Sequence, residues 1–163
     1  MESGHFYFFN DDYFIDFPDD NLMKNKETIN GQVHGRPSFY AFQDPKTLLY
    51  WMIPISSQLP KFKKLYNEKT ANGKPCDTIV FGDLLGHEKA FLIQNMCPIL
   101  PKYIDNEYID ARINIPAKIN GALEKDIIQK AKKILALVRH GNAFLIKPDV
   151  LKIEKELLDS IMI

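Results

Sequence analysis

Short blocks of aromatic and aliphatic residues occupy the first two-thirds of the chain, and turn-forming residues end each block. This pattern is typical of buried β-strands joined by short turns. It predicts strands over residues 5–9, 38–42, 48–55, 77–82 and 89–94, with a short strand over 112–115. The polar stretch from residue 18 to residue 35 predicts a surface loop. Together the blocks indicate a sheet region that covers about residues 5–115.

The period of the apolar residues becomes helical in three segments. An inserted amphipathic helix is predicted over about residues 58–69, because apolar residues recur there at helical spacing between lysines. Two more helices are predicted over about residues 121–140 and 148–160, with Asn120 as the N-cap of the first. The 163 residues therefore predict one α+β domain over residues 1–163, built on a small, strongly bent antiparallel sheet or an SH3-like barrel.

The charges of the chain cancel overall but not locally. Lys and Arg together number 21, and Asp and Glu together also number 21. The absence of a basic excess argues mildly against a generic nucleic-acid binder. Residues 1–20 hold six acidic and no basic side chains, whereas residues 56–74 and 118–140 each carry four more basic than acidic ones. The two basic segments are either solvated helix faces or the two sides of one anion-binding surface.

Standard signatures of several protein classes are missing from the sequence. No apolar run approaches the roughly 18 residues of a membrane helix, and residues 1–5 lack the features of a signal peptide, so a cytoplasmic location is expected. Cys76 and Cys97 form neither a disulfide framework nor a zinc-binding pattern, and both are expected in the core. Gly-rich phosphate loops and metal-ligand spacings are also missing, so no metal or cofactor is expected.

Two hydroxyl residues, Ser56 and Ser57, end a predicted buried strand and lead directly into the predicted helix at 58–69. Free backbone N–H groups at the start of a helix favour an anion. The two hydroxyls and Lys61 would complete such a site for a phosphate group. The alternative is that Ser57 only caps the helix and that Lys61 is solvated.

Two other places on the chain offer groups for a phosphate-bearing ligand. Arg36 precedes a proline in an extended segment, from which its planar guanidinium can reach a phosphate, and His34 lies close to it in the sequence. Tyr13 can stack on a base or bond to a phosphate oxygen. The alternatives are a surface arginine at the start of a strand and a core tyrosine in an aromatic segment.

The order and spacing of these residues resemble those of the endoribonuclease toxins of bacterial type III toxin–antitoxin systems, the ToxN, AbiQ and CptN group, with CptN as the most similar branch. The resemblance covers about residues 6–142 and is carried by Phe6-Tyr7, Tyr13, Arg36 with the strand that follows it, and Pro54-Ile55-Ser56-Ser57 with Lys61. It implies a Kid/MazF-like, SH3-like barrel with added helices. It also implies an antitoxin that is a repeated RNA pseudoknot, which the toxin cuts from its precursor and which holds the toxin in a closed protein–RNA assembly.

The resemblance also implies roles for the candidate residues. Ser57 matches the essential serine of the active site, Ser56 its hydroxyl neighbour, and Lys61 the lysine that follows. Tyr13 matches an active-site tyrosine, and Arg36 stands where relatives can have lysine. Lys63 and Lys64 are alternatives to Lys61. The side chains expected to bind RNA are His34, Lys63, Lys64, Lys118, Lys130, Lys133 and Arg139.

The implied activity is sequence-specific, metal-independent cleavage of RNA, in which the substrate's own 2′-OH attacks the adjacent phosphorus and leaves a 2′,3′-cyclic phosphate and a 5′-OH. The expected substrates are cellular and phage RNA, in a role of phage defence. No membrane and no protein antitoxin is expected as a partner. Two alternatives stay open: a non-catalytic SH3-like module that binds nucleic acid or peptide, and a MazF-like ribonuclease that a protein antitoxin inhibits.

Overall fold

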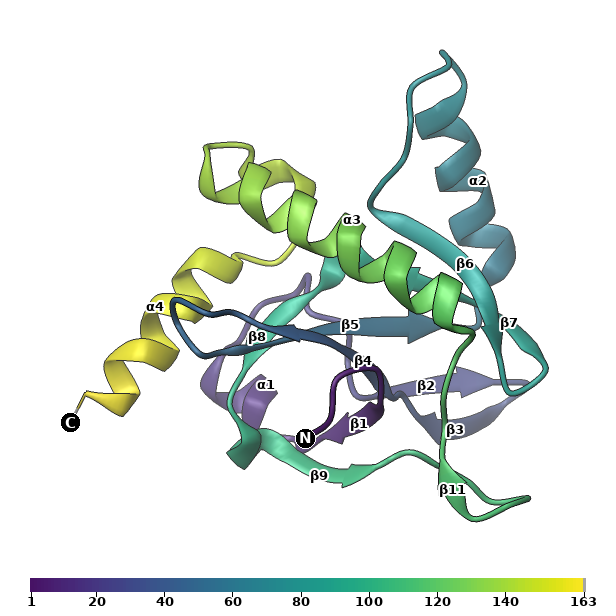
Figure 1. Cartoon of the computed structure of the whole chain (residues 1–163), viewed down its shortest axis with the longest axis horizontal. Coiled ribbons are helices and arrows are strands. Elements are labelled where there is room, and N and C mark those ends of the chain that lie inside the picture. Colours follow the sequence, from purple (N-terminus) through teal and green to yellow (C-terminus); the bar gives the residue numbers. More distant parts are fainter. Residues whose placement is uncertain (163) are drawn as a thin grey trace.

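A seven-stranded antiparallel sheet forms the centre of the computed structural model, which describes residues 1–162 (Figure 1). Its strands run in the order β6-β7-β5-β4-β1-β9, and β8 also pairs with β5. They are β1 (Phe6–Phe9), β4 (Ser38–Gln43), β5 (Tyr50–Ser56), β6 (Ile79–Leu84), β7 (His87–Leu92), β8 (Cys97–Ile99) and β9 (Ile104–Glu107). The predicted α+β class is confirmed. Of the two predicted forms, the bent antiparallel sheet is the one observed: within residues 1–162 the end strands β6 and β9 do not pair with each other, so the sheet is not closed.

The sheet bends where two irregularities interrupt its pairing. The register shifts between Phe8 and Phe9 in the β1–β9 pair and between Tyr40 and Phe42 in the β4–β5 pair. Bulges of this kind bend a strand and increase its twist. The first residues of β5 pair with β8, whereas its last two residues pair with β7. The C-terminal end of β5 therefore lies beside β7, just before the next helix begins.

A separate hairpin of two strands, β2 (Lys26–Ile29) and β3 (Gln32–Gly35), occupies part of the stretch from residue 18 to residue 35 that is predicted as a surface loop. The loop prediction is wrong because the Asn30-Gly31 turn folds the chain back on itself. Both turn residues have positive φ, 51° and 78°, as a tight two-residue hairpin turn requires. Most side chains of the hairpin are exposed, so the two strands lack the apolar alternation by which a half-buried strand is recognised.

In residues 1–162, four α-helices accompany the sheet: α1 (Asp12–Asp16), α2 (Leu59–Thr70), α3 (Gly121–Arg139) and α4 (Val150–Ile161). The side-chain oxygen of Asn120 caps α3 by accepting a hydrogen bond from Ala122 N at 2.8 Å. α4 begins after Pro148 rather than at it, since the carboxylate of Asp149 accepts from Lys152 N and sets the first turn. No helix within residues 1–162 is both long enough and apolar enough to cross a membrane.

Several short elements connect these helices and strands. Three are 3₁₀-helices, namely η1 (Ile93–Asn95), η2 (Pro101–Tyr103) and η3 (Ala143–Leu145). A small hairpin of β10 (Ile109–Asp110) and β11 (Ile115–Pro116) replaces the single strand predicted at 112–115. Cys76 and Cys97 are buried free thiols, as expected for core cysteines.

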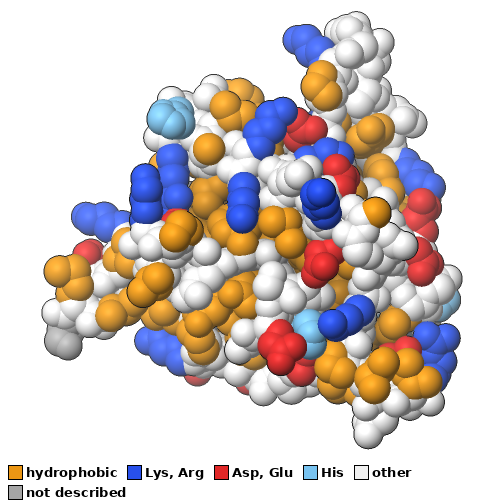
Figure 2. Space-filling view, viewed as in Figure 1, with side chains coloured by type: hydrophobic (Ala, Val, Ile, Leu, Met, Phe, Trp, Pro, Cys, Tyr) orange, Lys and Arg blue, Asp and Glu red, His pale blue; other side chains and the backbone are white. Residues whose placement is uncertain are grey.

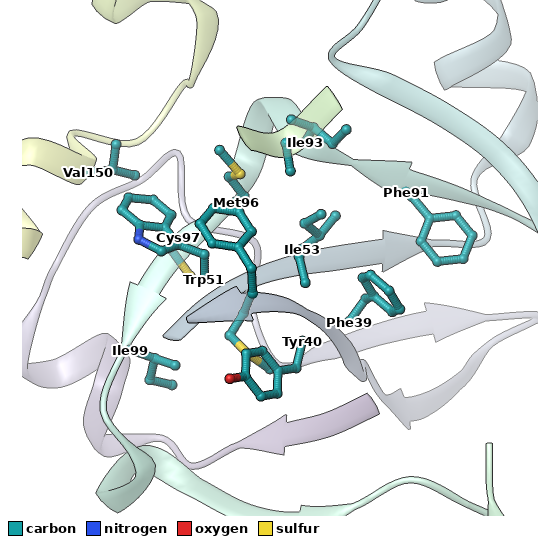
Figure 3. Packing of buried hydrophobic residues seen from close by; sticks show 14 of the residues in the cluster. Phe39, Tyr40, Trp51, Ile53, Phe91, Ile93, Met96, Cys97, Ile99 and Val150 are labelled. Carbon is teal, nitrogen blue, oxygen red and sulfur yellow. The ribbon is translucent and has the colours of Figure 1, made fainter. Parts of the chain in front are cut away.

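The main core includes side chains from the sheet and from both C-terminal helices, and Figure 3 shows part of it. Phe39 and Phe91 are fully buried there, with ring centroids 6.1 Å apart. A smaller cluster lies under α2, where Phe62 packs with Ile79 and Leu92 of the β6–β7 pair. Burial of such a side chain contributes about 1.5–3 kcal/mol. Phe62 therefore holds α2 on the sheet and fixes the position of the residues just before it.

Arg139, predicted to bind RNA, is occupied by contacts within the fold. Its guanidinium pairs with Asp44 in the β4–β5 turn and with Glu154 of α4, and it lies over the ring of Trp51. Burial by itself raises the pKa of Asp44. The N–H of Lys46 and the Arg139 guanidinium outweigh burial, so the pKa of Asp44 lies below its ordinary value. Arg139 thus links α3 to two other parts of the chain.

The Asp44→Asn variant is expected to be less stable by about 1.5–3 kcal/mol at pH 7, the usual contribution of a hydrogen bond to a charged group. Folding lowers the pKa of this carboxylate, so its charge stabilises the protein fully at pH values above about 4, the pKa of an aspartate in the unfolded chain. This stabilisation is lost as the pH falls through the pKa of the folded state. Urea unfolding measures the difference in free energy of unfolding between the wild-type protein and Asp44→Asn at pH 7 and at pH 3. This difference should be smaller at pH 3 than at pH 7. A difference of equal size at both pH values would contradict this account.

Candidate active site

A cleft of about 330 Å³ lies where the β2–β3 hairpin meets the β6–β7 hairpin and the end of β5. Figure 1 shows both hairpins extending to the same side of the molecule. The first hairpin contributes Glu27 and His34 to the cleft, and the second contributes His87 and Lys89. Its apolar wall includes Phe8, Ile55, Leu84 and Tyr108.

Ser57 follows β5 and bonds to two of the residues that line this cleft. Its hydroxyl accepts a hydrogen bond from Lys89 Nζ at 2.5 Å and donates to Glu27 Oε1 at 3.2 Å. Ser56, by contrast, is buried, and its hydroxyl accepts from Gln58 N at 3.1 Å. The helix-cap alternative therefore does not describe Ser57: Ser56 satisfies an amide next to α2, while the Ser57 hydroxyl contacts charged side chains.

The carboxylate of Glu27 is held in place by Arg36. Arg36 Nη1 lies 3.2 Å from Glu27 Oε2 and also donates to the carbonyl of Ile55 at 2.7 Å, while Nε donates to the carbonyl of Lys24 at 2.8 Å. Both charged side chains are less than a tenth exposed. Burial lowers the pKa of Arg36, and the negative charge of Glu27 partly offsets this effect. Arg36 is thus close to Ser57, but it acts on the serine through Glu27.

The ammonium group of Lys89 gives the cleft its positive charge, because the neighbouring ion pair is neutral as a whole. An ammonium has three donors, so Lys89 can hold Ser57 and an anion at the same time. His34 and His87 are exposed and line the cleft from different hairpins, and an imidazole nitrogen can accept or donate a proton. The cleft therefore combines a cation that can bind an anion with two groups that can transfer protons.

Tyr13 lies in the core and not in the cleft. Its side chain is fully buried and makes edge-to-face contacts with Phe9, Phe14 and Tyr103. Its hydroxyl donates to the carbonyl of Pro98 at 2.8 Å, and burial raises the pKa of Tyr13 well above its ordinary value. The placement of Tyr13 is that of the core tyrosine considered as the alternative for this aromatic segment.

The lysines of α2 form no bond with the Ser57 hydroxyl in the described part of the chain. Lys61 extends over the neighbouring phenylalanine, 5.3 Å from the ring centroid. Lys63 forms an ion pair with a glutamate of β7 at 2.7 Å, and Lys64 is exposed. The amino group beside Ser57 comes instead from Lys89.

Glu27, His87 and Lys89 line the cleft, but no local pattern in the sequence marks them as functional residues. Lys89 reaches Ser57 through the pairing of β5 with β7, which no local pattern of residues reveals. Glu27 lies opposite His34 in the β2–β3 hairpin. The Asn-Gly turn signal is the feature that could have found this hairpin and with it the carboxylate.

The two basic segments of the sequence meet at a groove of about 470 Å³, here named the lysine groove, whose lysines are Lys69, Lys74, Lys133 and Lys147. It also includes Phe144, whose side chain is exposed. Figure 2 shows further Lys and Arg side chains gathered over α3. Thr78 lines the groove and Leu84 lines the cleft, and the strand between them spans about 20 Å at about 3.3 Å per residue. The groove and the cleft are therefore separate.

The remaining predicted RNA-binding lysines lie on or near α3. Lys130 pairs with Asp126 at 3.0 Å, and Lys133 pairs with Asp77 at 2.6 Å at the lysine groove. Lys118 is exposed just before the helix. In residues 1–162, no group of three or more His, Cys, Asp or Glu side chains could hold a metal ion.

Comparison with known proteins identifies the fold. No family model matches the chain, and no curated protein matches it. Among solved structures it is similar to AbiQ, a lactococcal anti-phage endoribonuclease of a type III toxin–antitoxin system, with a TM-score of 0.68 and 11% identity over 99% of both chains. It is also similar to a structure from a bacterial antiviral system that a processed non-coding RNA regulates, with a TM-score of 0.61 and 14% identity over 95% of this chain and 97% of the other. The chain thus has the AbiQ-type fold that its sequence resemblance implies.

Proposed function

We propose that this protein is an endoribonuclease toxin of a type III toxin–antitoxin system and that it cuts RNA at the cleft between the β2–β3 and β6–β7 hairpins, here named the Ser57 cleft after the serine bonded to its lining residues. One observation carries the proposal: the Ser57 hydroxyl lies between an ammonium and a carboxylate, beside a cleft that also holds two histidines. The similarity in fold to AbiQ, an endoribonuclease, supports the same class of activity.

The proposed reaction uses the 2′-OH of the RNA as the nucleophile. The 2′ oxygen attacks the adjacent phosphorus, the bond from phosphorus to the 5′ oxygen breaks, and the products carry a 2′,3′-cyclic phosphate and a 5′-OH. The enzyme has to align the two oxygens, stabilise charge on the non-bridging phosphate oxygens and move two protons. None of these tasks requires a covalent bond to the serine.

Lys89 and Ser57 stabilise the phosphate. Negative charge grows on the non-bridging oxygens as the 2′ oxygen attacks, and donors already fixed in place stabilise this charge. Lys89 uses one of its three N–H donors on Ser57, so the other two remain for the phosphate. The bond from Ser57 to Glu27, at 3.2 Å, is longer than the usual O–H···O distance of about 2.7–2.8 Å. The hydroxyl can therefore turn from Glu27 to a phosphate oxygen at low cost.

His34 and His87 transfer the protons. Attack requires a base that takes the proton of the 2′-OH, and departure of the 5′ oxygen requires an acid that gives one. Neutral imidazole performs the first task and imidazolium the second. The two residues line the cleft from different hairpins, so one phosphate between them can meet both groups. In this mechanism the two histidines divide the acid and base roles.

A repeated pseudoknot RNA is the proposed antitoxin, held with the toxin in a closed assembly. Such an assembly requires each protein copy to contact RNA on two separate surfaces. The Ser57 cleft and the lysine groove are two such surfaces, about 20 Å apart along β6. In the groove, lysines neutralise backbone phosphates and the Phe144 ring stacks on an unpaired base. Cellular and phage RNA are the proposed substrates.

Incubation of the purified protein with pooled cellular RNA in EDTA tests the activity. Fragments with 2′,3′-cyclic phosphate and 5′-OH ends, absent when Ser57→Ala is used, would establish a metal-independent ribonuclease. The same fragments at the same rate from a Ser57→Ala preparation would show that Ser57 takes no part in the cleavage, and cleavage at this serine would be rejected. If the wild-type protein cuts nothing in so broad a pool, the proposal is rejected.

Replacement of both Lys74 and Lys147 by alanine is expected to weaken binding of the antitoxin RNA and to lower its dependence on salt. Each phosphate that a lysine no longer neutralises reduces the slope of log affinity against log salt by about 0.7–0.9, so the slope of the double variant should fall by about 1.5. Fluorescence anisotropy titrations at several salt concentrations measure this slope. Cleavage of a short RNA that fills only the cleft should be unchanged.

The matched control is a double variant with Lys46→Ala and Lys155→Ala, which removes the same charge from exposed positions outside the lysine groove. Its salt slope should equal that of the wild-type protein. An equal decrease in both double variants would show that net charge, and not the groove, determines RNA binding.

A further inference from the structure

A second hollow, of about 310 Å³, adjoins the Ser57 cleft at the β10–β11 hairpin. It is named here the Arg112 pocket, and it is lined by residues 108–112 together with Leu85 and His87. Leu85, His87 and Tyr108 also line the Ser57 cleft, so the two hollows are continuous. A strand whose scissile phosphate lies beside Ser57 would therefore place a neighbouring nucleotide in the Arg112 pocket.

Arg112 is exposed but held in one orientation. Its Nε donates to Asp110 Oδ1 at 3.1 Å and its Nη2 donates to Asp110 Oδ2 at 3.0 Å, and 70% of the arginine side chain is exposed against 7% of the aspartate side chain. The carbonyl of Asp110 also accepts from Asn114 N at 2.8 Å, which closes the turn that carries Arg112. Two parallel hydrogen bonds to a buried carboxylate fix the plane of the guanidinium before any ligand arrives.

Tyr108 forms the wall shared by the two hollows. Its backbone N–H donates to the carbonyl of Phe6 at 2.8 Å, which ties it to the central sheet. Its ring packs edge-on against Phe8, with centroids 5.6 Å apart and planes at 73°. The Arg112 pocket thus has one fixed aromatic ring and the apolar side chains of Leu85 and Ile109 beside one fixed planar cation.

We propose that the Arg112 pocket binds the base of the nucleotide next to the scissile phosphate and that it prefers guanine. The assignment rests on the endoribonuclease function proposed above. Flat apolar and aromatic walls suit a nucleobase, because unpaired bases in RNA stack on aromatic side chains. The volume lies near the lower end of the range of ligand pockets, about 300–1,000 Å³, and so accommodates one unpaired base rather than a double helix.

The preference for guanine follows from the donors that Asp110 leaves on Arg112. A guanidinium has five N–H donors. Asp110 occupies the one on Nε and one of the two on Nη2. The remaining N–H of Nη2 and a parallel N–H of Nη1 point away from Asp110 in the same plane. Such a pair matches O6 and N7 of guanine, whereas adenine presents a donor amino group in place of O6.

Titration with 3′-GMP and 3′-AMP tests the pocket without any need for cleavage. The wild-type protein should bind 3′-GMP about tenfold more tightly than 3′-AMP, since one bidentate pair discriminates by a factor of about 5–150. Arg112→Ala should fold, since most of this side chain is exposed, and should bind both nucleotides equally. Asp110→Asn keeps the Arg112 cation but removes the carboxylate that fixes the plane of its guanidinium. Its preference for 3′-GMP over 3′-AMP should therefore be smaller than that of the wild-type protein. A preference for 3′-GMP that persists in Arg112→Ala overturns the assignment.

Cleavage of an RNA library randomised around the cut gives a second measurement. Guanine should be enriched at one position beside the cut made by the wild-type protein, and Arg112→Ala should cut with this enrichment lost. Lys155→Ala, which removes an exposed cation outside the pocket, should keep it. If the wild-type protein does not cleave, the proposed function fails, while the nucleotide titration still decides the pocket. Unchanged enrichment in Arg112→Ala overturns the assignment of the pocket alone.

Discussion

The Ser57→Ala variant is expected to cleave RNA about 10²–10³-fold more slowly than the wild-type protein, the usual loss when one donor to a developing oxyanion is removed. RNA binding should change little, because Lys89 keeps its charge and the cleft keeps its lining. Single-turnover cleavage of one defined RNA measures the first quantity. Binding of the same RNA with a 2′-deoxy group at the cut position, which blocks the attack, measures the second.

Ser56→Ala is the matched control, since it removes the same hydroxyl one residue earlier. The Ser56 hydroxyl is buried and accepts from Gln58 N, so its loss should cost about 1 kcal/mol of stability and leave cleavage intact. Equal loss of cleavage in both variants would indicate that the turn before α2, and not the Ser57 hydroxyl, is required. Normal cleavage by Ser57→Ala would remove this serine from the mechanism.

The Arg36→Ala variant is expected to be less stable by about 3–5 kcal/mol, the cost of leaving a buried charge without its partner. Three acceptors lose their donor at once: the Glu27 carboxylate and the carbonyls of Lys24 and Ile55. Cleavage should fall as well, because Glu27 no longer holds the Ser57 hydroxyl in one position. Urea unfolding measures the stability, and cleavage is compared at a temperature at which the variant is folded.

A double variant with Arg36→Ala and Glu27→Ala separates the two effects. Removal of both charges leaves no unpaired ion, so much of the lost stability should return. Cleavage should stay low, because Glu27 no longer holds the backbone N–H and the hydroxyl of Ser57 in place beside Lys89 before RNA binds. A single Arg36→Ala variant as stable as the wild-type protein would contradict the description of a buried ion pair.

The helices were predictable because their signals are local. Apolar residues at helical spacing mark α3, Asn120 caps its start, and Gly141, with φ of 108°, follows its end. Each of these signals depends on residues a few positions apart. α2 and α3 accordingly lie within one residue of the predicted ranges, 58–69 and 121–140.

The exposed hairpin and the open sheet were not predictable in the same way. β2 and β3 carry mostly polar side chains, so their composition resembles that of a loop although the Asn30-Gly31 turn is present. Closure of a sheet depends on whether its end strands meet. Here β6 and β9 stay apart, and no property of either strand alone decides this.

The sequence by itself determined where the helices and most buried strands lie and that a pair of hydroxyls ends a buried strand, because these features depend on neighbouring residues. Only the tertiary structure decided which charged groups meet Ser57. Glu27 comes from 30 positions earlier and Lys89 from 32 positions later, whereas the nearby Lys61 extends along its own helix. The physical reason is that strand register is a property of the whole sheet, set by burial of one face and by turn geometry.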